Sequence, residues 1–268
     1  MKKKNDIKSI FFWVGLCVLA LAAGILEWIA PTFSEDALAD RLIRENILRV
    51  LCGGGVLMLL LRFKIGVFGK PNWCGLPLIM PFALVAVCNF PFVDCLTGNV
   101  SLVREDLIWQ FGLYCLLIGI FEEFLFRGLL FSIFLERYYQ NRKELFFAIL
   151  FSSSIFGLIH LFNLFGGSGV GPVLLQICYS FGIGAMLCMV LLCTGNIWFC
   201  VLIHAGFDFA GLFYEMLGNG LFWSVPTVII TLVSSIIAVL WGIWLFFKRD
   251  FQKLFCVFVY ARNEKNMK

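Results

Sequence analysis

Six ionisable side chains lie deep inside apolar stretches of the sequence, where charge is rare. They comprise two adjacent glutamates, an arginine, an aspartate and the only two histidines of the chain: Glu122, Glu123, Arg127, His160, His204 and Asp208. An Arg or Asp at bilayer depth costs roughly 2.5–3.5 kcal/mol on insertion scales. We therefore interpret these residues as a polar site built inside a membrane bundle.

The spacing of these residues predicts specific pairs. Positions four apart share one face of a helix, so Glu123 and Arg127 are expected to form an ion pair. Glu122 is rotated by about 100° from Glu123, which leaves its carboxylate free for a water or a metal. His204 and Asp208 are also four apart, so the carboxylate can orient the imidazole or act as a second ligand.

Two imidazoles and two carboxylates remain once Glu123 and Arg127 are paired. Such a set suits a divalent metal with an open water position, or a glutamate that deprotonates a water directly. Either arrangement activates a water for hydrolysis. No Ser or Cys stands beside a His in a way that requires a covalent nucleophile; Ser152, Ser153 and Ser154, on the expected His160 helix, are expected to bond to backbone.

The positioning elements are expected to be transmembrane helices, and the fold class all-α. Hydrophobic residues make up 61% of the 268 residues and charged residues 14%, whereas soluble domains are near 45–50% and 25%. Apolar runs of roughly the 20 residues that span a bilayer recur along the chain. We expect about eight spans, at 10–30, 47–61, 76–96, 107–135, 145–165, 170–193, 197–217 and 225–247.

The distribution of Lys and Arg predicts the orientation of this polytopic bundle. Of the 21 basic residues, 16 fall at the two termini or in the loops near 62–75, 136–144 and 194–196, all on one side of an eight-span bundle. Excess basic residues mark the cytoplasmic side, so both termini are expected to be cytoplasmic. The opposite side receives Arg41, Arg44, Arg49 and Arg104. This asymmetry accounts for the net charge of +4 without a nucleic-acid partner.

No soluble domain is expected beside the spans. The longest loops, near 31–46 and 62–75, are too short to bury a core. Residues 1–268 are therefore predicted to form a single transmembrane domain, with membrane lipid around it.

Three short motifs in order carry a resemblance to a known family. Glu-Glu-x-x-x-Arg on one span, Phe156-x-x-x-His160 on the next and His204-x-x-x-Asp208 two spans later resemble the CAAX-protease and bacteriocin-processing family. This family is also called CPBP or ABI, and it includes the Ras-converting CAAX endopeptidases. The resemblance covers about 107–215, the catalytic helices.

The resemblance implies an eight-helix intramembrane endopeptidase. It would be either a metalloendopeptidase that uses Zn²⁺ or another divalent metal, or an enzyme that uses metal-free glutamate chemistry. The resemblance makes Glu122 the water-activating base and Glu123 and Arg127 supporting residues. The residues that it places around the water or metal are Glu122, His160, His204 and Asp208. An Asp at the last motif position adds negative charge, which favours a bound cation.

We predict from the sequence a protease of a prokaryotic plasma membrane. Its substrate is expected to be a peptide or protein precursor that is either lipidated, such as a prenylated CAAX-like tail, or strongly apolar. Three alternatives stay open. They are a non-proteolytic immunity or scaffold protein of the same family, an ion-coupled transporter with a carboxylate relay, and a haem protein ligated by His160 and His204.

Overall fold

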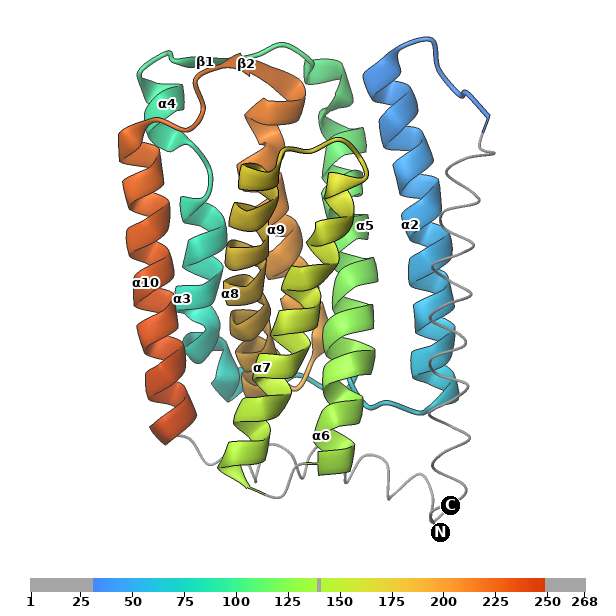
Figure 1. Cartoon of the computed structure of the whole chain (residues 1–268), viewed down its shortest axis with the longest axis vertical. Coiled ribbons are helices and arrows are strands. Elements are labelled where there is room, and N and C mark those ends of the chain that lie inside the picture. Colours follow the sequence, from blue (N-terminus) through green and yellow to red (C-terminus); the bar gives the residue numbers. More distant parts are fainter. Residues whose placement is uncertain (1–30, 139–140, 249–268) are drawn as a thin grey trace.

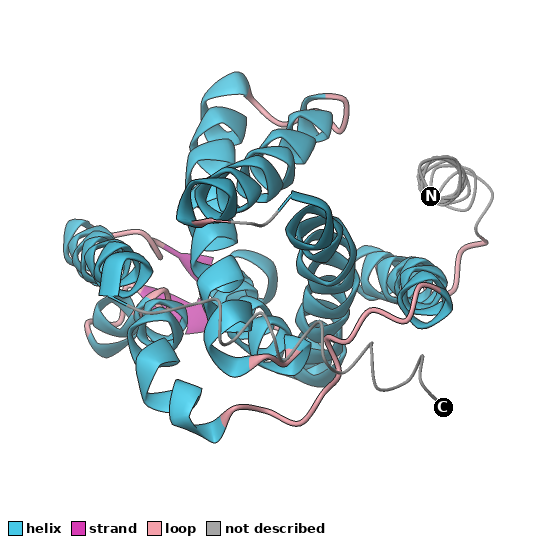
Figure 2. Cartoon of the chain, turned by 90° about the horizontal axis from the view of Figure 1, so that it is seen from below, coloured by secondary structure: helices cyan, strands magenta, loops and turns pink. Residues whose placement is uncertain are grey.

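The protein is described by a computed structural model in which residues 31–138 and 141–248 are placed. The expected span at 10–30 and both chain termini lie outside these residues. The described part is a bundle of roughly parallel and antiparallel helices (Figure 1). Seen from below, the helices stand side by side, and the short strand pair lies at their far end (Figure 2).

The elements follow the expected spans in order. The long helical segments are α2 (Ala37–Arg62), α3 (Leu76–Cys88), α5 (Ile108–Glu123), η3 (Phe124–Phe131), α6 (Ser132–Tyr138), α7 (Arg142–Leu158), η4 (Ile159–Leu164), α8 (Val170–Thr194), α9 (Ile197–Leu217) and α10 (Val225–Lys248). Short elements join them: η1 (Trp73–Gly75), α4 (Phe92–Leu96), η2 (Glu105–Leu107), β1 (Val100–Leu102) and β2 (Gly218–Gly220). An all-helical bundle is therefore confirmed.

Four helical segments of the described residues are long and apolar enough to cross a membrane. They are Arg142–Leu164, Val170–Thr194, Ile197–Leu217 and Val225–Lys248, with Trp73–Cys88 as a shorter apolar helix. The count of eight spans stays a prediction, as does the side on which the termini lie.

Two expectations about the boundaries were wrong. The expected loop at 31–46 is helical from Ala37, because Asp36 caps α2 by accepting the Ala39 amide at 2.7 Å and the polar residues that follow fit one helix face. Arg49, counted above with the outer side, therefore lies near the middle of the 26-residue helix α2. The expected span at 76–96 is interrupted at Pro91, whose ring cannot continue a helix.

Charged residues gather at the two ends of the bundle. Arg62 ends α2, Arg142 and Lys143 begin α7, and Lys248 ends α10. All these positions are at the end drawn lowest in Figure 1, which we call the lower end. The upper end holds Arg104, paired with Asp36 at 2.9 Å. These basic residues thus lie at the two ends of the bundle, whereas Arg49 lies between them.

The lower end is closed by a segment from far along the chain. The Ile197 amide donates to Val67 O at 2.9 Å, and Asn196 Nδ2 donates to Gly69 O at 2.7 Å. Gly75 packs so tightly on α8 that an added Cβ would lie 2.0 Å from Cys193 O. These contacts, which we call the lower clasp, fix the start of α9 two turns before His204.

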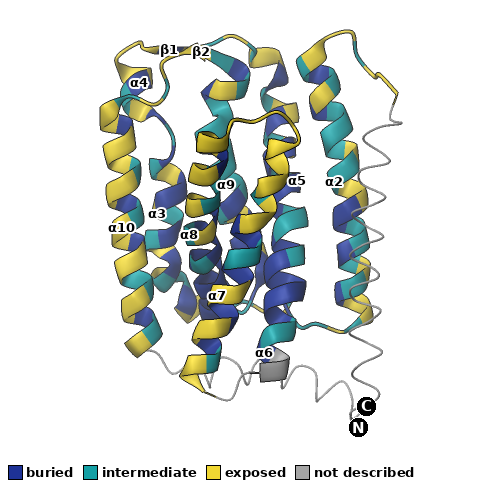
Figure 3. Ribbon diagram, viewed as in Figure 1, coloured by how far each residue is buried: buried dark blue, intermediate teal, exposed yellow. Residues whose placement is uncertain are grey.

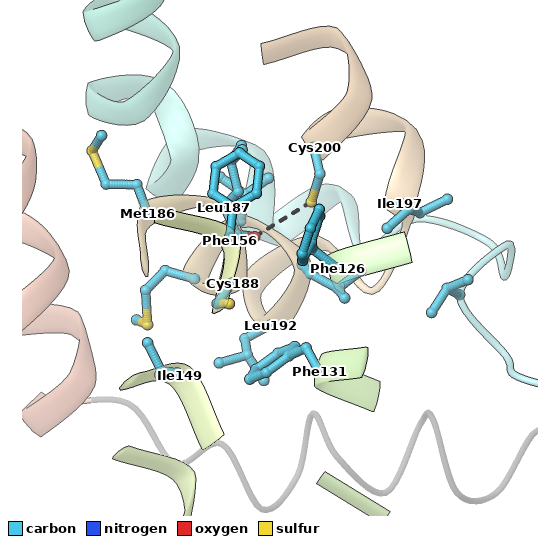
Figure 4. Packing of buried hydrophobic residues seen from close by; sticks show 14 of the residues in the cluster. Phe126, Phe131, Ile149, Phe156, Met186, Leu187, Cys188, Leu192, Ile197 and Cys200 are labelled. Atoms are coloured by element: carbon cyan, nitrogen blue, oxygen red, sulfur yellow. Dashed lines mark hydrogen bonds between the residues drawn. The ribbon is translucent and has the colours of Figure 1, made fainter. Parts of the chain in front are cut away.

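The hydrophobic core lies around the lower half of α8. Residues 186–194 are all buried, whereas most of α10 is exposed (Figure 3). Phe126, Phe131 and Phe156 pack against α8, and the Cys200 thiol donates to Leu187 O at 3.4 Å (Figure 4). Exposed apolar residues on the outer helices suit contact with lipid.

The start of α10 is held by a carboxylate from another element. Buried Asp94 on α4 accepts the Thr227 hydroxyl at 2.7 Å and the Ser224 amide at 3.3 Å. Burial alone would raise the pKa of Asp94, but hydrogen bonds from Ser224, Thr227 and Asn99 outweigh it and lower the pKa. Above the pKa that Asp94 has in the unfolded protein, the ionised carboxylate therefore stabilises the fold. This contribution is lost as the pH falls through the lower pKa of Asp94 in the folded protein.

We expect Asp94→Ala to lower the melting temperature of the detergent-solubilised protein at pH 7, since losing a helix cap costs about 1 kcal/mol. The wild type should lose its advantage over the variant as the pH falls below about 4. Glu105→Gln, at an exposed position on the same end of the bundle, is the matched control. Equal melting temperatures of Asp94→Ala and wild type at pH 7 would contradict the capping role.

Candidate active site

The two glutamates end α5, and the chain continues directly into a π-helical segment, η3. In a π-helix, backbone hydrogen bonds join residues five apart instead of four, and such segments are frequent at functional sites. Ser132 Oγ donates to Arg127 O at 3.0 Å, and Ser152 Oγ on α7 donates to Phe126 O at 3.2 Å. The prediction that serines of this helix satisfy backbone is confirmed for Ser152.

Glu123 and Arg127 form the ion pair that their spacing predicted. Arg127 Nη1 donates to Glu123 Oε1 at 2.8 Å, and neither side chain is exposed. The guanidinium also lies over the Phe156 ring, 4.2 Å from its centroid. Because a Cβ on Gly184 would lie 3.2 Å from Arg127 Nη2, the glycine leaves the guanidinium room against α8.

His204 binds to the same carboxylate oxygen. Its Nδ1 lies 2.7 Å from Glu123 Oε1, and since a carboxylate only accepts, Nδ1 carries the proton. The imidazole is thereby fixed in one orientation, with Nε2 directed away from Glu123. Helices α5 and α9 pack closely enough for this contact because residue 119 on α5 has no side chain. A Cβ on Gly119 would lie only 2.9 Å from Val201 O on α9.

The other face of His204 meets the two remaining carboxylates. His204 Nε2 lies 3.6 Å from Glu122 Oε2 and 3.5 Å from Asp208 Oδ2. The Glu122 and Asp208 side chains are 23% and 19% exposed, in contrast to sealed Glu123. Glu122 and Glu123 thus have different surroundings, as their rotation about the helix predicted.

His160 stands apart from this group. It lies on η4, and its Nδ1 is 3.0 Å from Phe156 O and 3.3 Å from Gly157 O. Because carbonyl oxygens accept, Nδ1 carries the proton and Nε2 is left as an acceptor. Within the described residues His160 has no hydrogen bond or ion pair with Glu122, His204 or Asp208. Both imidazoles contact the Phe156 ring edge-on, at 5.5 Å for His160 and 5.7 Å for His204 between ring centroids.

The predicted metal ligands are brought together only in part. Glu122, His204 and Asp208 meet around His204 Nε2, and His160 is linked to them through Phe156. Imidazole and carboxylate donors suit a divalent cation, but among residues 31–138 and 141–248 no three His, Cys, Asp or Glu side chains are grouped as ligands. The metal stays a prediction from the types of donor.

Two glycines that position the site were not singled out from the sequence. Gly119 lets α5 approach α9, and Gly184 accommodates Arg127. A small residue inside an apolar helix often marks close helix packing, and this signal was available at both positions. Ala205 on α9 also lies close to α5, since its Cβ would lie 3.3 Å from a Cβ on Gly119.

Removing Arg127 should destabilise the protein more than replacing Glu122 with glutamine. Arg127→Leu leaves the Glu123 carboxylate buried without its cation, and breaking a buried ion pair costs roughly 3–5 kcal/mol. Glu122→Gln, at a partly exposed position, should change the free energy of unfolding by less than about 1 kcal/mol. Denaturant titration of both variants measures this difference, and a loss below about 1 kcal/mol for Arg127→Leu would contradict the role given to the pair.

One family model matches the chain. Residues 104–210 match a model described as Rce1-like, type II CAAX prenyl endopeptidase Rce1-like. No curated protein and no solved structure matches. The matched segment begins just before α5 and ends within α9, so it contains all six predicted site residues. Together with the four apolar helices it indicates a multi-pass membrane protein. The match of residues 104–210 to the Rce1-like type II CAAX prenyl endopeptidase model agrees with the family resemblance of the sequence.

Proposed function

We propose that the chain is an intramembrane endopeptidase that hydrolyses one peptide bond of an apolar or lipidated peptide, such as a CAAX-like tail. The family match supports protease activity at the level of the family. The observation that carries the proposal for this chain is the meeting of His204 Nε2 with partly exposed Glu122 and Asp208 at 3.5–3.6 Å. These separations exceed a direct hydrogen bond, and they suit groups that bind one water together.

Glu122 is the proposed general base. Its carboxylate takes a proton from a water while the water oxygen attacks the carbonyl carbon of the scissile bond. The proton then passes to the leaving amine nitrogen as the carbon–nitrogen bond breaks. His204 contributes the acceptor Nε2, which holds the second hydrogen of the water, and Asp208 offers a further acceptor beside it.

Glu123 and Arg127 are proposed as positioning residues. Both are sealed from solvent, so neither reaches a substrate. Their role is to fix the tautomer and direction of His204, as outer partners do for other catalytic imidazoles. His160, whose Nε2 is an acceptor, is proposed to contact the substrate or the water from η4.

We expect Glu122→Gln to lower kcat of peptide hydrolysis by roughly 10²–10⁴-fold, the usual contribution of a general base. The amide keeps the shape of the side chain but cannot accept the proton. Glu215→Gln, which changes an exposed carboxylate on α9, is the matched control and should retain activity. Purified protein in detergent with a fluorogenic apolar peptide provides the assay. A loss below tenfold for Glu122→Gln would remove Glu122 from this role.

We also propose a divalent cation, because Asp208 adds a carboxylate to two imidazoles and one glutamate. Glu122, His204, Asp208 and His160 would hold it, and it would supply a positive charge that lowers the pKa of a bound water. Purified active protein should then contain a stoichiometric metal by elemental analysis. His204→Ala should lose both the metal and the activity, since affinity depends on the full ligand set. Full activity with far less than one metal ion per chain would contradict the proposed cation. It would not contradict the proposed role of Glu122 as general base.

The remaining parts of the proposal concern setting and substrate. The apolar runs support eight spans, and the distribution of basic residues supports a cytoplasmic location of both termini. A prokaryotic plasma membrane and a precursor peptide as substrate follow from the compact chain and short loops. The same hydrolysis assay separates this function from an immunity or scaffold role, which needs no cleavage.

A further inference from the structure

Arg49 is a charged residue near the middle of α2 that the proposed chemistry does not use. It is the last charged residue before an apolar run over 50–61, and a cation within a membrane helix is costly unless it serves a purpose. Its nearest partner is Glu45, one turn earlier on α2. Its guanidinium also lies 4.8 Å from the centroid of the Tyr114 ring on α5, so it points from α2 towards the helix that carries Glu122.

The charge of Arg49 reaches the site. Its guanidinium, placed against Tyr114 on α5, is close enough to interact with the carboxylates of Glu122 and Asp208. Arg49 therefore adds a second cation, besides Arg127, near these carboxylates.

The guanidinium has donors left for a ligand. A single nitrogen, Nη1, makes both contacts to Glu45, one to its carboxylate and one to its backbone carbonyl. Among the described residues, Nε and Nη2 have no hydrogen-bond acceptor, although the side chain is only 19% exposed. An arginine fork with free donors binds a carboxylate more specifically than a lysine would.

Arg49 lies beside the helix that carries the proposed base. Tyr114, whose ring the guanidinium contacts, precedes Glu122 by eight positions, which is about 12 Å along a helix axis. A carboxylate at Arg49 would therefore leave a short C-terminal segment of an extended substrate between Arg49 and Glu122.

We infer that Arg49 binds the free C-terminal carboxylate of the substrate and so directs cleavage towards that end. This inference rests on the proposed endopeptidase function and deepens it. It agrees with a CAAX-like substrate, in which three residues follow the cysteine. Glu45 holds the guanidinium in place, and Arg49 is thus a specificity-determining residue.

The cleavage test compares one apolar peptide with a free C-terminal carboxylate against the same peptide with a C-terminal amide. Wild type should prefer the carboxylate in kcat/KM by roughly ten- to hundredfold, the size of a hydrogen bond to a charged group. In Arg49→Gln this ratio should fall close to one, and the ratio cancels any general loss of folded protein. Arg44→Gln, one turn and a residue earlier on α2, is the matched control and should keep the wild-type ratio. A ratio unchanged in Arg49→Gln overturns the inference.

A binding test separates the inference from the proposed function. In the Glu122→Gln background, an apolar tripeptide with a free carboxylate should bind at least about tenfold more tightly than its amide, and adding Arg49→Gln should abolish this difference. Equal binding of acid and amide in Glu122→Gln overturns the inference even where the wild type cleaves peptides. Arg49-dependent binding without any cleavage by the wild type upholds the carboxylate site and rejects the protease.

Discussion

The arrangement of the site depends on one buried oxygen atom, Glu123 Oε1. It accepts from Arg127 at 2.8 Å and from His204 at 2.7 Å, and so it links α5, η3 and α9. A carboxylate sealed from water is stable only when it is paired and hydrogen-bonded, and two charged or polar donors meet this need. The same requirement explains two glycines. Gly119 allows α9 to approach α5, and Gly184 leaves room on α8 for the Arg127 guanidinium.

Two chemically identical neighbours acquire different roles through this constraint. Glu123 is fixed, neutralised and inaccessible, whereas Glu122 keeps 23% of its side chain exposed and has no arginine within contact distance among the described residues. The same part of the fold thus holds one carboxylate that orients His204 and one that stays accessible. Phe156 adds to this division, since its ring contacts Arg127 and both imidazoles and excludes water from that side.

Local spacing was enough to predict much of this arrangement. The helices, the Glu123–Arg127 pair, the His204–Asp208 pair and the different fate of Glu122 all follow from a period of 3.6 residues. Contacts between distant helices could not be predicted this way. The hydrogen bond from His204 to Glu123, the separate position of His160 and the direction of Arg49 towards Tyr114 depend on how α2, α5, α7 and α9 pack. The π-helical turn after Glu123 has no periodic signal either, and the start of α2 was missed because its first turns are highly charged.

Because Glu123 and Arg127 lie one turn apart on a single helix, their charges neutralise each other before any other part of the site exists. During synthesis, His204 follows Glu123 by 81 residues, so the segment that carries both glutamates is made long before α9. A local ion pair lowers the cost of placing this segment in an apolar environment, since either charge alone would be unfavourable there. The contact of His204 with Glu123 Oε1 forms only when α9, whose start is held by the lower clasp, docks against α5.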